Sequence, residues 1–281
     1  MTGVALIQNI DACRLRPGQC ALWWLGQHGF AIKLGDTVLY IDAFLSKLPG
    51  RQVPPLLEPG QVTNACLVLG SHDHGDHIDR PAWPAIAATS PGTTFIVPLV
   101  LRERIIKELD LAGNRVVGLD EGRATEIAGI RISAVPAAHE FLDADPDTGR
   151  HPYLGFVIEG NGFCLYHAGD SCIYEGLYDR LRRQRLDLMI LPINGRDARR
   201  LKAGCIGNMT YQEAADLAGT LRPGAVIPAH YEMFAMNAAD VGEFVEYMQV
   251  KYPQQRVEVP RHGRRVIIET LLTGKEPVCR T

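Results

Sequence analysis

The run His-Asp-His-Gly-Asp-His at residues 72–77 places three imidazoles and two carboxylates in six consecutive positions, just after the apolar segment Cys66–Leu69. Neutral imidazole and carboxylate are the donors that borderline divalent metals prefer. His72 and His74 lie two apart in an extended segment and project to the same side. Asp76 and His77 fall where the chain turns toward an expected helix, so they can face a second point nearby. The stretch therefore predicts two adjacent metal positions, as in two-metal hydrolysis. The alternative, a solvated histidine-rich loop, is disfavoured by the preceding apolar strand and the lack of low-complexity sequence.

This run resembles the HxHxDH signature of the metallo-β-lactamase-fold hydrolases. That family completes its metal site with a His, an Asp and a His at the ends of later strands. The chain offers a match for each in the same order, directly after an apolar segment. The resemblance implies three ligands to a first ion, three ligands to a second ion, and one bridging carboxylate. In that order they are His72, His74 and His139, then Asp76, His77 and His230, and finally Asp170.

Further roles follow from the same resemblance. It implies two divalent ions per chain, Mn²⁺ or Zn²⁺, separated by ~3.5–4 Å and sharing a hydroxide. Asp76 is expected to be the catalytic residue as well as a ligand, because it can orient that hydroxide or pass a proton to the leaving group. Asp42 follows the strand-like segment Thr37–Ile41 and is expected to brace the histidine loop without touching the metal. Plain strand termination is the alternative for Asp42.

Patterns of apolar residues predict an α/β chain that forms a single domain over residues 1–281. Thr210 and Glu213 form a capping box that opens a helix. Helices are expected at residues 99–109, 174–183, 211–221 and 240–252. Strands are expected at residues 21–25, 30–34, 37–41, 66–69, 93–97, 130–135, 163–168, 188–191, 225–228, 256–259 and 265–268. Strands followed by helices in each half suit the αββα sandwich of the family that the chain resembles.

Composition limits the partners. A hydrophobic content of 46% and a charged content of 22% are typical of a globular protein. The net charge of −3 gives no electrostatic reason to expect nucleic acid as a partner. No apolar stretch has the ~18 residues of a membrane span, and the first residues lack the pattern of a secretory signal. Seven scattered cysteines without a C-x-x-C pair favour reduced thiols and a cytoplasmic location.

Several stretches resemble one branch of the family, the L-ascorbate-6-phosphate lactonase-like proteins. They are residues 21–26 (Ala-Leu-Trp-Trp-Leu-Gly), 72–79, 165–171, 207–210 and 226–230. The resemblance implies hydrolysis of a small sugar-derived lactone or ester, with or without a phosphate group, by a homo-oligomer. The chain departs from the lactonase in being shorter and in the segment Pro136–Glu140, which follows the general superfamily. The resemblance therefore supports the branch better than it supports ascorbate 6-phosphate as the substrate.

A phosphorylated substrate needs donors besides the metal ions. The loop after the expected strand at 188–191 contains Asn194, Arg196 and Arg199, and Arg can bind phosphate oxygens through two hydrogen bonds. His151, at the end of another loop, is a further candidate for substrate binding. A solvated basic loop is the alternative, and the acidic segment 140–147 would repel a phosphate.

Other functions remain open at this stage. The fold also supports phosphodiesterases and nucleases, although the weakly acidic chain disfavours nucleic acid. Diiron oxidoreductases of the fold replace the second histidine of the signature with an acidic residue, and this chain has His74 there. A protein that keeps the fold only as a binding platform would be expected to have lost ligands, and none is missing here.

Overall fold

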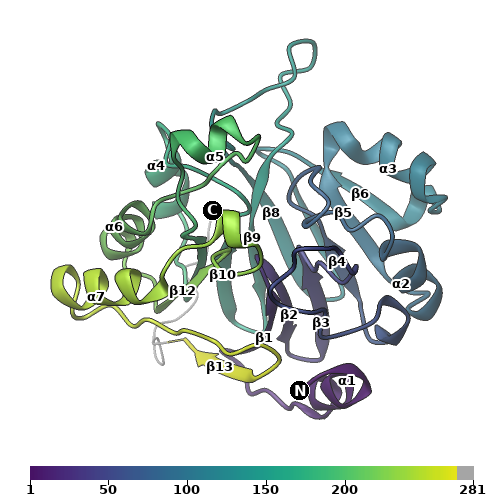
Figure 1. The fold of residues 1–281 in the computed structure, drawn as a ribbon. Coiled ribbons are helices and arrows are strands. Elements are labelled where there is room, and N and C mark those ends of the chain that lie inside the picture. Colours follow the sequence, from purple (N-terminus) through teal and green to yellow (C-terminus); the bar gives the residue numbers. More distant parts are fainter. Residues whose placement is uncertain (271–281) are drawn as a thin grey trace, which may run out of the picture.

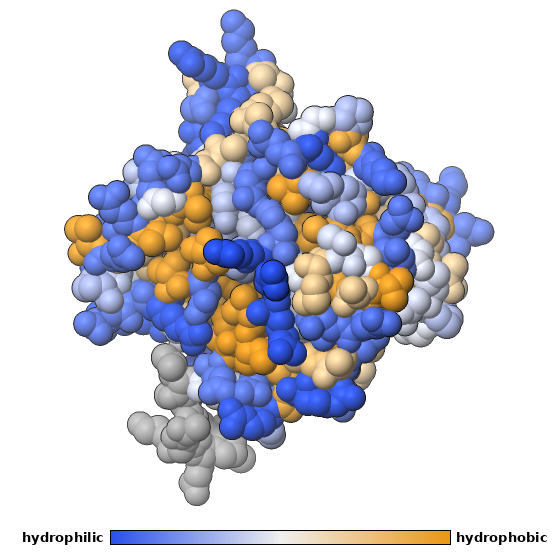
Figure 2. Space-filling model, turned by 60° about the horizontal axis from the view of Figure 1, so that its bottom comes forward, coloured by the Kyte–Doolittle hydropathy of each residue, from blue (hydrophilic) through white to orange (hydrophobic). Residues whose placement is uncertain are grey.

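A computed structural model describes residues 1–270 of the chain. Two mixed β-sheets pack face to face, and helices cover the outer face of each sheet (Figure 1). The four-layer αββα arrangement expected from the sequence is confirmed. The face that carries the N-terminus and the last strand has an apolar area at its centre, crossed by long hydrophilic side chains (Figure 2).

The first sheet has seven strands in the order β13-β1-β2-β3-β4-β5-β6. The strands from β13 to β3 pair antiparallel, and those from β3 to β6 pair parallel. Their bounds are β1 Gln19–Gly26, β2 Gly29–Leu34, β3 Thr37–Ile41, β4 Leu67–Leu69, β5 Thr94–Pro98, β6 Val116–Leu119 and β13 Arg265–Glu269. The parallel half places the carboxyl ends of β3 and β4 at one edge.

The second sheet has six strands in the order β12-β11-β10-β9-β8-β7. Here β10, β11 and β12 run parallel, and the pairs from β7 to β10 are antiparallel. The bounds are β7 Ala124–Ile127, β8 Ile130–Pro136, β9 Leu154–Gly160, β10 Phe163–His167, β11 Leu188–Pro192 and β12 Ala225–Ala229.

Seven α-helices lie in the described chain: α1 Gly3–Ala12, α2 Trp83–Thr89, α3 Arg102–Leu109, α4 Leu177–Arg182, α5 Ala198–Lys202, α6 Tyr211–Leu221 and α7 Val241–Lys251. The first three share an apolar cluster with the outer face of the first sheet. Helices α4, α6 and α7 pack with the second sheet and with the layer between the sheets.

Strand β1 shows how the sequence sets these layers. Leu22 and Trp24 belong to the core between the sheets, whereas Trp23 and Leu25 belong to the core beneath the outer helices. Successive side chains of a strand point to opposite faces, so the consecutive tryptophans Trp23 and Trp24 fill two different cores. Both are almost fully buried, which explains an apolar run without polar alternation.

Most expected elements are confirmed, and several differ. Helix α1 and the strands β6, β7 and β9 were not among the expected elements. Residues 99–101 form a short 3-10 helix before α3. The expected strand at 256–259 is only an isolated bridge between Val226 and Val257. Helix α5 lies in the expected basic loop, where the Asp197 carboxylate accepts hydrogen bonds from two backbone N–H groups and caps its first turn. No helix among residues 1–270 is long and apolar enough to cross a membrane.

Candidate metal centre

The seven expected ligands come from four strand ends. The run 72–77 follows β4, His139 follows β8, Asp170 follows β10 and His230 follows β12. These ends meet at the edge of the sandwich from which the segment after β8 projects, at the top of Figure 1. Residues separated by up to 158 positions along the chain thus reach one place, because β4 lies in one sheet and the other three strands lie in the facing sheet.

The first ligand set converges as one ion would require. One donor atom from each of His72, His74 and His139 lies within 4.8 Å of the others. His72 Nε2 and His74 Nδ1 are 2.9 Å apart. Two nitrogens that share one ion at a bond length of ~2.1 Å are separated by roughly 3 Å. The donor set therefore fits a divalent metal.

The second set, Asp76, His77 and His230, also has its donor atoms within 4.8 Å of one another. Asp170 lies beside it, with Oδ1 3.4 Å from His77 Nε2 and Oδ2 3.2 Å from His230 Nε2. Asp170 also groups with His72 and His77, so its carboxylate faces both ligand sets. His77 Nε2 is buried and has no hydrogen-bond partner, which suits a nitrogen that binds a metal.

Burial governs the imidazoles of the first set. It lowers the pKa of His72 and of His74, and it lowers the pKa of His139 to about 4. Nearby carboxylates act against burial at each of these rings but do not outweigh it. The three rings therefore favour the neutral form, which is the form that binds a metal.

Charge governs the second set. Burial tends to lower the pKa of His77 and of His230, but the neighbouring carboxylates outweigh it and raise the pKa of both rings. Burial tends to raise the pKa of Asp170, whereas the charges of His230 and His77 bring it well below the usual range. The raised pKa of His77 and of His230 means that the carboxylates stabilise positive charge at this place, so a bound cation is stabilised there too.

Ser71 and Asp42 brace the histidine run from behind. Asp42 accepts hydrogen bonds from the backbone N–H and the hydroxyl of Ser71 at 2.8 and 2.7 Å. Its Oδ2 also lies 2.8 Å from His77 Nδ1, and the Ser71 hydroxyl lies 2.9 Å from His72 Nδ1. Because the Nδ1 atoms of His72 and His77 contact Ser71 and Asp42, the Nε2 atoms of these two rings are left to face the metal positions. Asp42 stands where the sequence predicted a bracing role, whereas Ser71 was not predicted.

A chain of three amides braces His139. His139 Nδ1 is 3.2 Å from Asn208 Oδ1, Asn208 Nδ2 donates to Asn194 Oδ1 at 3.1 Å, and Asn194 Nδ2 donates to Asn237 Oδ1 at 2.7 Å. Asn194 is only 2% exposed and both ends of its amide are engaged. It therefore supports a ligand, and its expected role in substrate binding stays a prediction.

Two residues of the β1–β2 turn also reach the site. Gln27 Nε2 donates to Asp76 Oδ2 at 2.8 Å and lies 3.2 Å from His230 Nε2. His28 Nδ1 is 3.5 Å from Asp170 Oδ1. Sequence reasoning assigned neither a role at the site, because a turn 45 residues before the histidine run carries no metal-binding spacing. The only signal was a polar pair, Gln-His, between two largely apolar strands.

The remaining residues expected to bind substrate are Arg196, Arg199 and His151, and their role stays a prediction. Both guanidinium Nη atoms of Arg196 donate to the Glu213 carboxylate, at 2.6 and 2.7 Å. Arg199 is exposed on α5. His151 Nδ1 lies 3.0 Å from Asp120 Oδ1. Arg196 already has a carboxylate partner, which leaves less of its charge for a phosphate.

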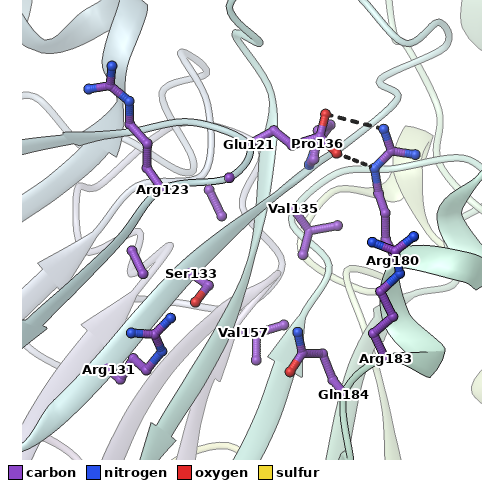
Figure 3. Close-up of a pocket in the computed structure, with 13 residues that line it drawn as sticks. Glu121, Arg123, Arg131, Ser133, Val135, Pro136, Val157, Arg180, Arg183 and Gln184 are labelled. Atoms are coloured by element: carbon purple, nitrogen blue, oxygen red, sulfur yellow. Dashed lines mark hydrogen bonds and ion pairs between the residues drawn. The ribbon is translucent and has the colours of Figure 1, made fainter. Parts of the chain in front are cut away.

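Two hollows bear on where a substrate would bind. One of about 290 Å³, on the outer face of the second sheet, is lined by arginines such as Arg131 and Arg183, and Glu121 binds Arg180 at its rim (Figure 3). None of the seven ligands lines that hollow. A second of about 140 Å³ is lined by Glu140, which follows the ligand His139 in the sequence, and by residues between 196 and 207, and no ligand lines it either.

Comparison with known proteins agrees with this geometry. A family model described as the β-lactamase superfamily domain matches residues 37–231. The chain is 30% identical over 223 residues to a UPF0173 metal-dependent hydrolase of Thermococcus onnurineus, covering 79% of this chain and 88% of that protein.

Two solved structures share the fold. The metallo hydrolase Igni18 of Ignicoccus hospitalis has a TM-score of 0.67 at 22% identity, over 89% of this chain and 99% of that one. CmlA, a diiron β-hydroxylase of Streptomyces venezuelae, has a TM-score of 0.66 at 16% identity, over 90% of this chain and 54% of that one. The same fold therefore occurs in a hydrolase and in an oxidising enzyme. The assignment of this chain to the hydrolases rests on the sequence relationship.

Proposed function

This chain belongs to the β-lactamase superfamily domain family, as a metal-dependent hydrolase of the metallo-β-lactamase fold, and we propose that it uses two divalent ions to hydrolyse a small lactone or carboxylic ester. The observation that carries the proposal is the convergence of two complete ligand sets on the carboxylate of Asp170. Retention of every ligand argues against a platform without activity.

When bound, divalent ions act as Lewis acids and lower the pKa of water to near neutrality. The protein contributes orientation. Gln27 donates to one oxygen of Asp76, which fixes the rotation of that carboxylate and leaves the other oxygen for a proton. Asp76 is therefore the group that we propose to hold the proton destined for the leaving group.

The ligands favour Zn²⁺ by the usual order of affinity, and the resemblance to the lactonase branch favours Mn²⁺. The proposal includes no phosphate on the substrate, because Arg196 is already bound by Glu213. Metal analysis of the purified protein, with activity restored in either metal, distinguishes the two ions.

The deciding experiment replaces one ligand. We expect His74→Ala to keep the fold, to lose metal, and to lower hydrolysis of a lactone and ester panel by more than ~100-fold, since changes to residues that only orient ligands already cost 10–100-fold. His262→Asn is the matched control, because His262 pairs with Glu232 and lies in none of the metal-capable groups of the described chain.

An unchanged rate in His74→Ala would rule out the proposal. The panel also contains phosphodiesters, and a rate confined to those substrates would replace lactone hydrolysis by the phosphodiesterase alternative.

A further inference from the structure

The hollow of about 140 Å³ that Glu140 lines is named here the α5 pocket. It lies between the segment after β8 and the segment that contains α5. Its lining consists of Glu140, Arg196, Asp197, Leu201, Cys205, Ile206 and Gly207. One water takes ~30 Å³ in the liquid, so the pocket holds a group of only a few non-hydrogen atoms.

The α5 pocket adjoins the metal ligands through both of its walls. On one wall, Glu140 directly follows the ligand His139. On the other, Gly207 directly precedes Asn208, whose side chain contacts His139 Nδ1. Cys205 lies within electrostatic reach of the site: burial is the main cause that raises its pKa, and the charges of Asp170 and Asp76 add to it. The pocket is therefore close to the metal ligands, although none of them lines it.

Two of the three charged side chains on the pocket walls, Arg196 and Asp197, already have charged partners. The guanidinium of Arg196 binds Glu213 and also donates to the Asn208 carbonyl at 3.1 Å. The Asp197 carboxylate caps α5 and pairs with Arg200 at 3.1 Å.

The other walls favour an uncharged occupant. Leu201, Ile206 and the Cys205 thiol are apolar or weakly polar. Glu140 adds a negative charge that repels an anionic group. An uncharged alkyl group is the occupant that this lining favours.

The rim of the pocket is also apolar. Leu201, which lines the pocket, is 54% exposed, and Phe141 and Leu142, which follow the lining residue Glu140 in the sequence, are 65% and 39% exposed. Phe141 and Leu142 begin the segment that projects beyond β8, and α5 lies beside the base of that segment (Figure 1). Large apolar side chains that remain exposed around a functional site commonly contact a ligand.

We propose that the α5 pocket binds a short, uncharged alkyl substituent of the substrate, next to the bond that is hydrolysed. This inference rests on the proposed function and narrows it, because it selects alkyl-substituted lactones and esters over polar or phosphorylated sugar lactones. Leu201 and Ile206 are then the residues that determine specificity.

The test measures binding and turnover separately on the metal-loaded full chain. Calorimetry with acetate, butanoate and hexanoate, which resemble the acid products, is expected to show affinity rising roughly fourfold per CH₂ group until the pocket is full. Hydrolysis of γ-lactones with no, methyl and ethyl substituents should follow the same trend in kcat/KM, and gluconolactone 6-phosphate should be the poorest substrate.

Two variants and one control locate the effect. Ile206→Asn and Leu201→Asn are each expected to flatten the dependence on chain length while acetate binding and metal content stay unchanged. Lys202→Gln, on the same helix but outside the lining, should keep the full dependence.

A flat dependence in the unaltered protein, or an unchanged dependence in both variants, overturns the inference. Absence of any lactone or ester hydrolysis overturns the proposed function instead, and the binding series still decides whether the pocket takes an alkyl chain.

Discussion

At the scale of single residues, Asn208 shows how a neutral side chain controls a metal ligand. Its amide oxygen contacts His139 Nδ1 and its amide nitrogen contacts Asn194. We expect Asn208→Ala to weaken metal binding about 10–100-fold, as is typical when the partner of a metal-bound histidine is lost. Competition with a chromogenic chelator measures this affinity.

Asn237→Ala is the matched control for that experiment, because Asn237 stands at the far end of the same amide chain. Its effect should be smaller. Equal metal affinity in Asn208→Ala and the unaltered protein would show that the amide chain does not orient His139.

His167 makes stability depend on pH. Its Nδ1 accepts a hydrogen bond from the Gly169 N–H and its Nε2 donates to the His28 carbonyl. Burial lowers its pKa to about 3, whereas the unfolded chain has the ordinary value of ~6.5. The unfolded state therefore binds more protons below pH 6.5, and the stability from this residue, complete above pH 6.5, is lost as the pH falls toward 3.

The loss should amount to about 2 kcal/mol between pH 6.5 and 5, at ~1.4 kcal/mol per pH unit. In urea unfolding at pH 7 and pH 5, we expect His167→Gln to show a pH dependence that is smaller by about this amount. The comparison between the two proteins removes the effect of losing metal at low pH. Identical pH dependence in both would contradict the assignment.

At the scale of elements, α6 depends on its capping box. The Thr210 hydroxyl accepts from the Glu213 N–H, and the Glu213 carboxylate accepts from the Thr210 N–H. Thr210→Ala should lower the free energy of unfolding by about 1 kcal/mol. Denaturant unfolding measures this loss, and Thr210→Ser should restore most of it. A loss in Thr210→Ser as large as in Thr210→Ala would show that the methyl group, not the hydroxyl, matters.

Elements with a strong local signal could be predicted from the sequence, and elements without one could not. The capping box identified α6, and unbroken apolar runs identified β1 and β10. Helix α5 has only five residues and is stabilised by Asp197 and by contacts of Arg200 with Asn194 and Ala238 carbonyls. Five residues are too few to show a helical period, and the Ala238 contact is 38 positions away, so the segment resembled a basic loop.

At the scale of the whole molecule, the metal ligands join the two sheets. We expect removal of metal by EDTA to lower Tm by roughly 10–20 °C and re-addition to restore it, because a ligand at 100 times its Kd adds ~2.7 kcal/mol at each of the two proposed sites and 1 kcal/mol corresponds to ~2–4 °C in larger chains. Scanning calorimetry measures the shift. His74→Ala should show a smaller shift, and an unchanged Tm on chelation would exclude bound metal.

The sequence located the ligands far better than the surroundings of the ligands. The spacing within residues 72–77 indicated a metal site, and the resemblance to the family signature implied that His139, Asp170 and His230, each after an apolar strand, would meet it. Gln27, Ser71 and Asn208 were missed because an amide or a hydroxyl acquires such a role only through contacts with residues brought close by folding. The partner of Arg196 was missed for the same reason: Glu213 is 17 positions away.

Strand β13 pairs with β1 across some 250 residues, from Gln19 against Glu269 to Trp23 against Arg265. During synthesis on a ribosome, every metal ligand up to His230 leaves the exit tunnel before β13, the strand that covers the outer edge of β1. The outer edge of β1, an unbroken apolar strand, is then open to other nascent chains. This edge has no partner between translation of His230 and translation of β13. We expect a chaperone to bind the nascent chain most in that interval.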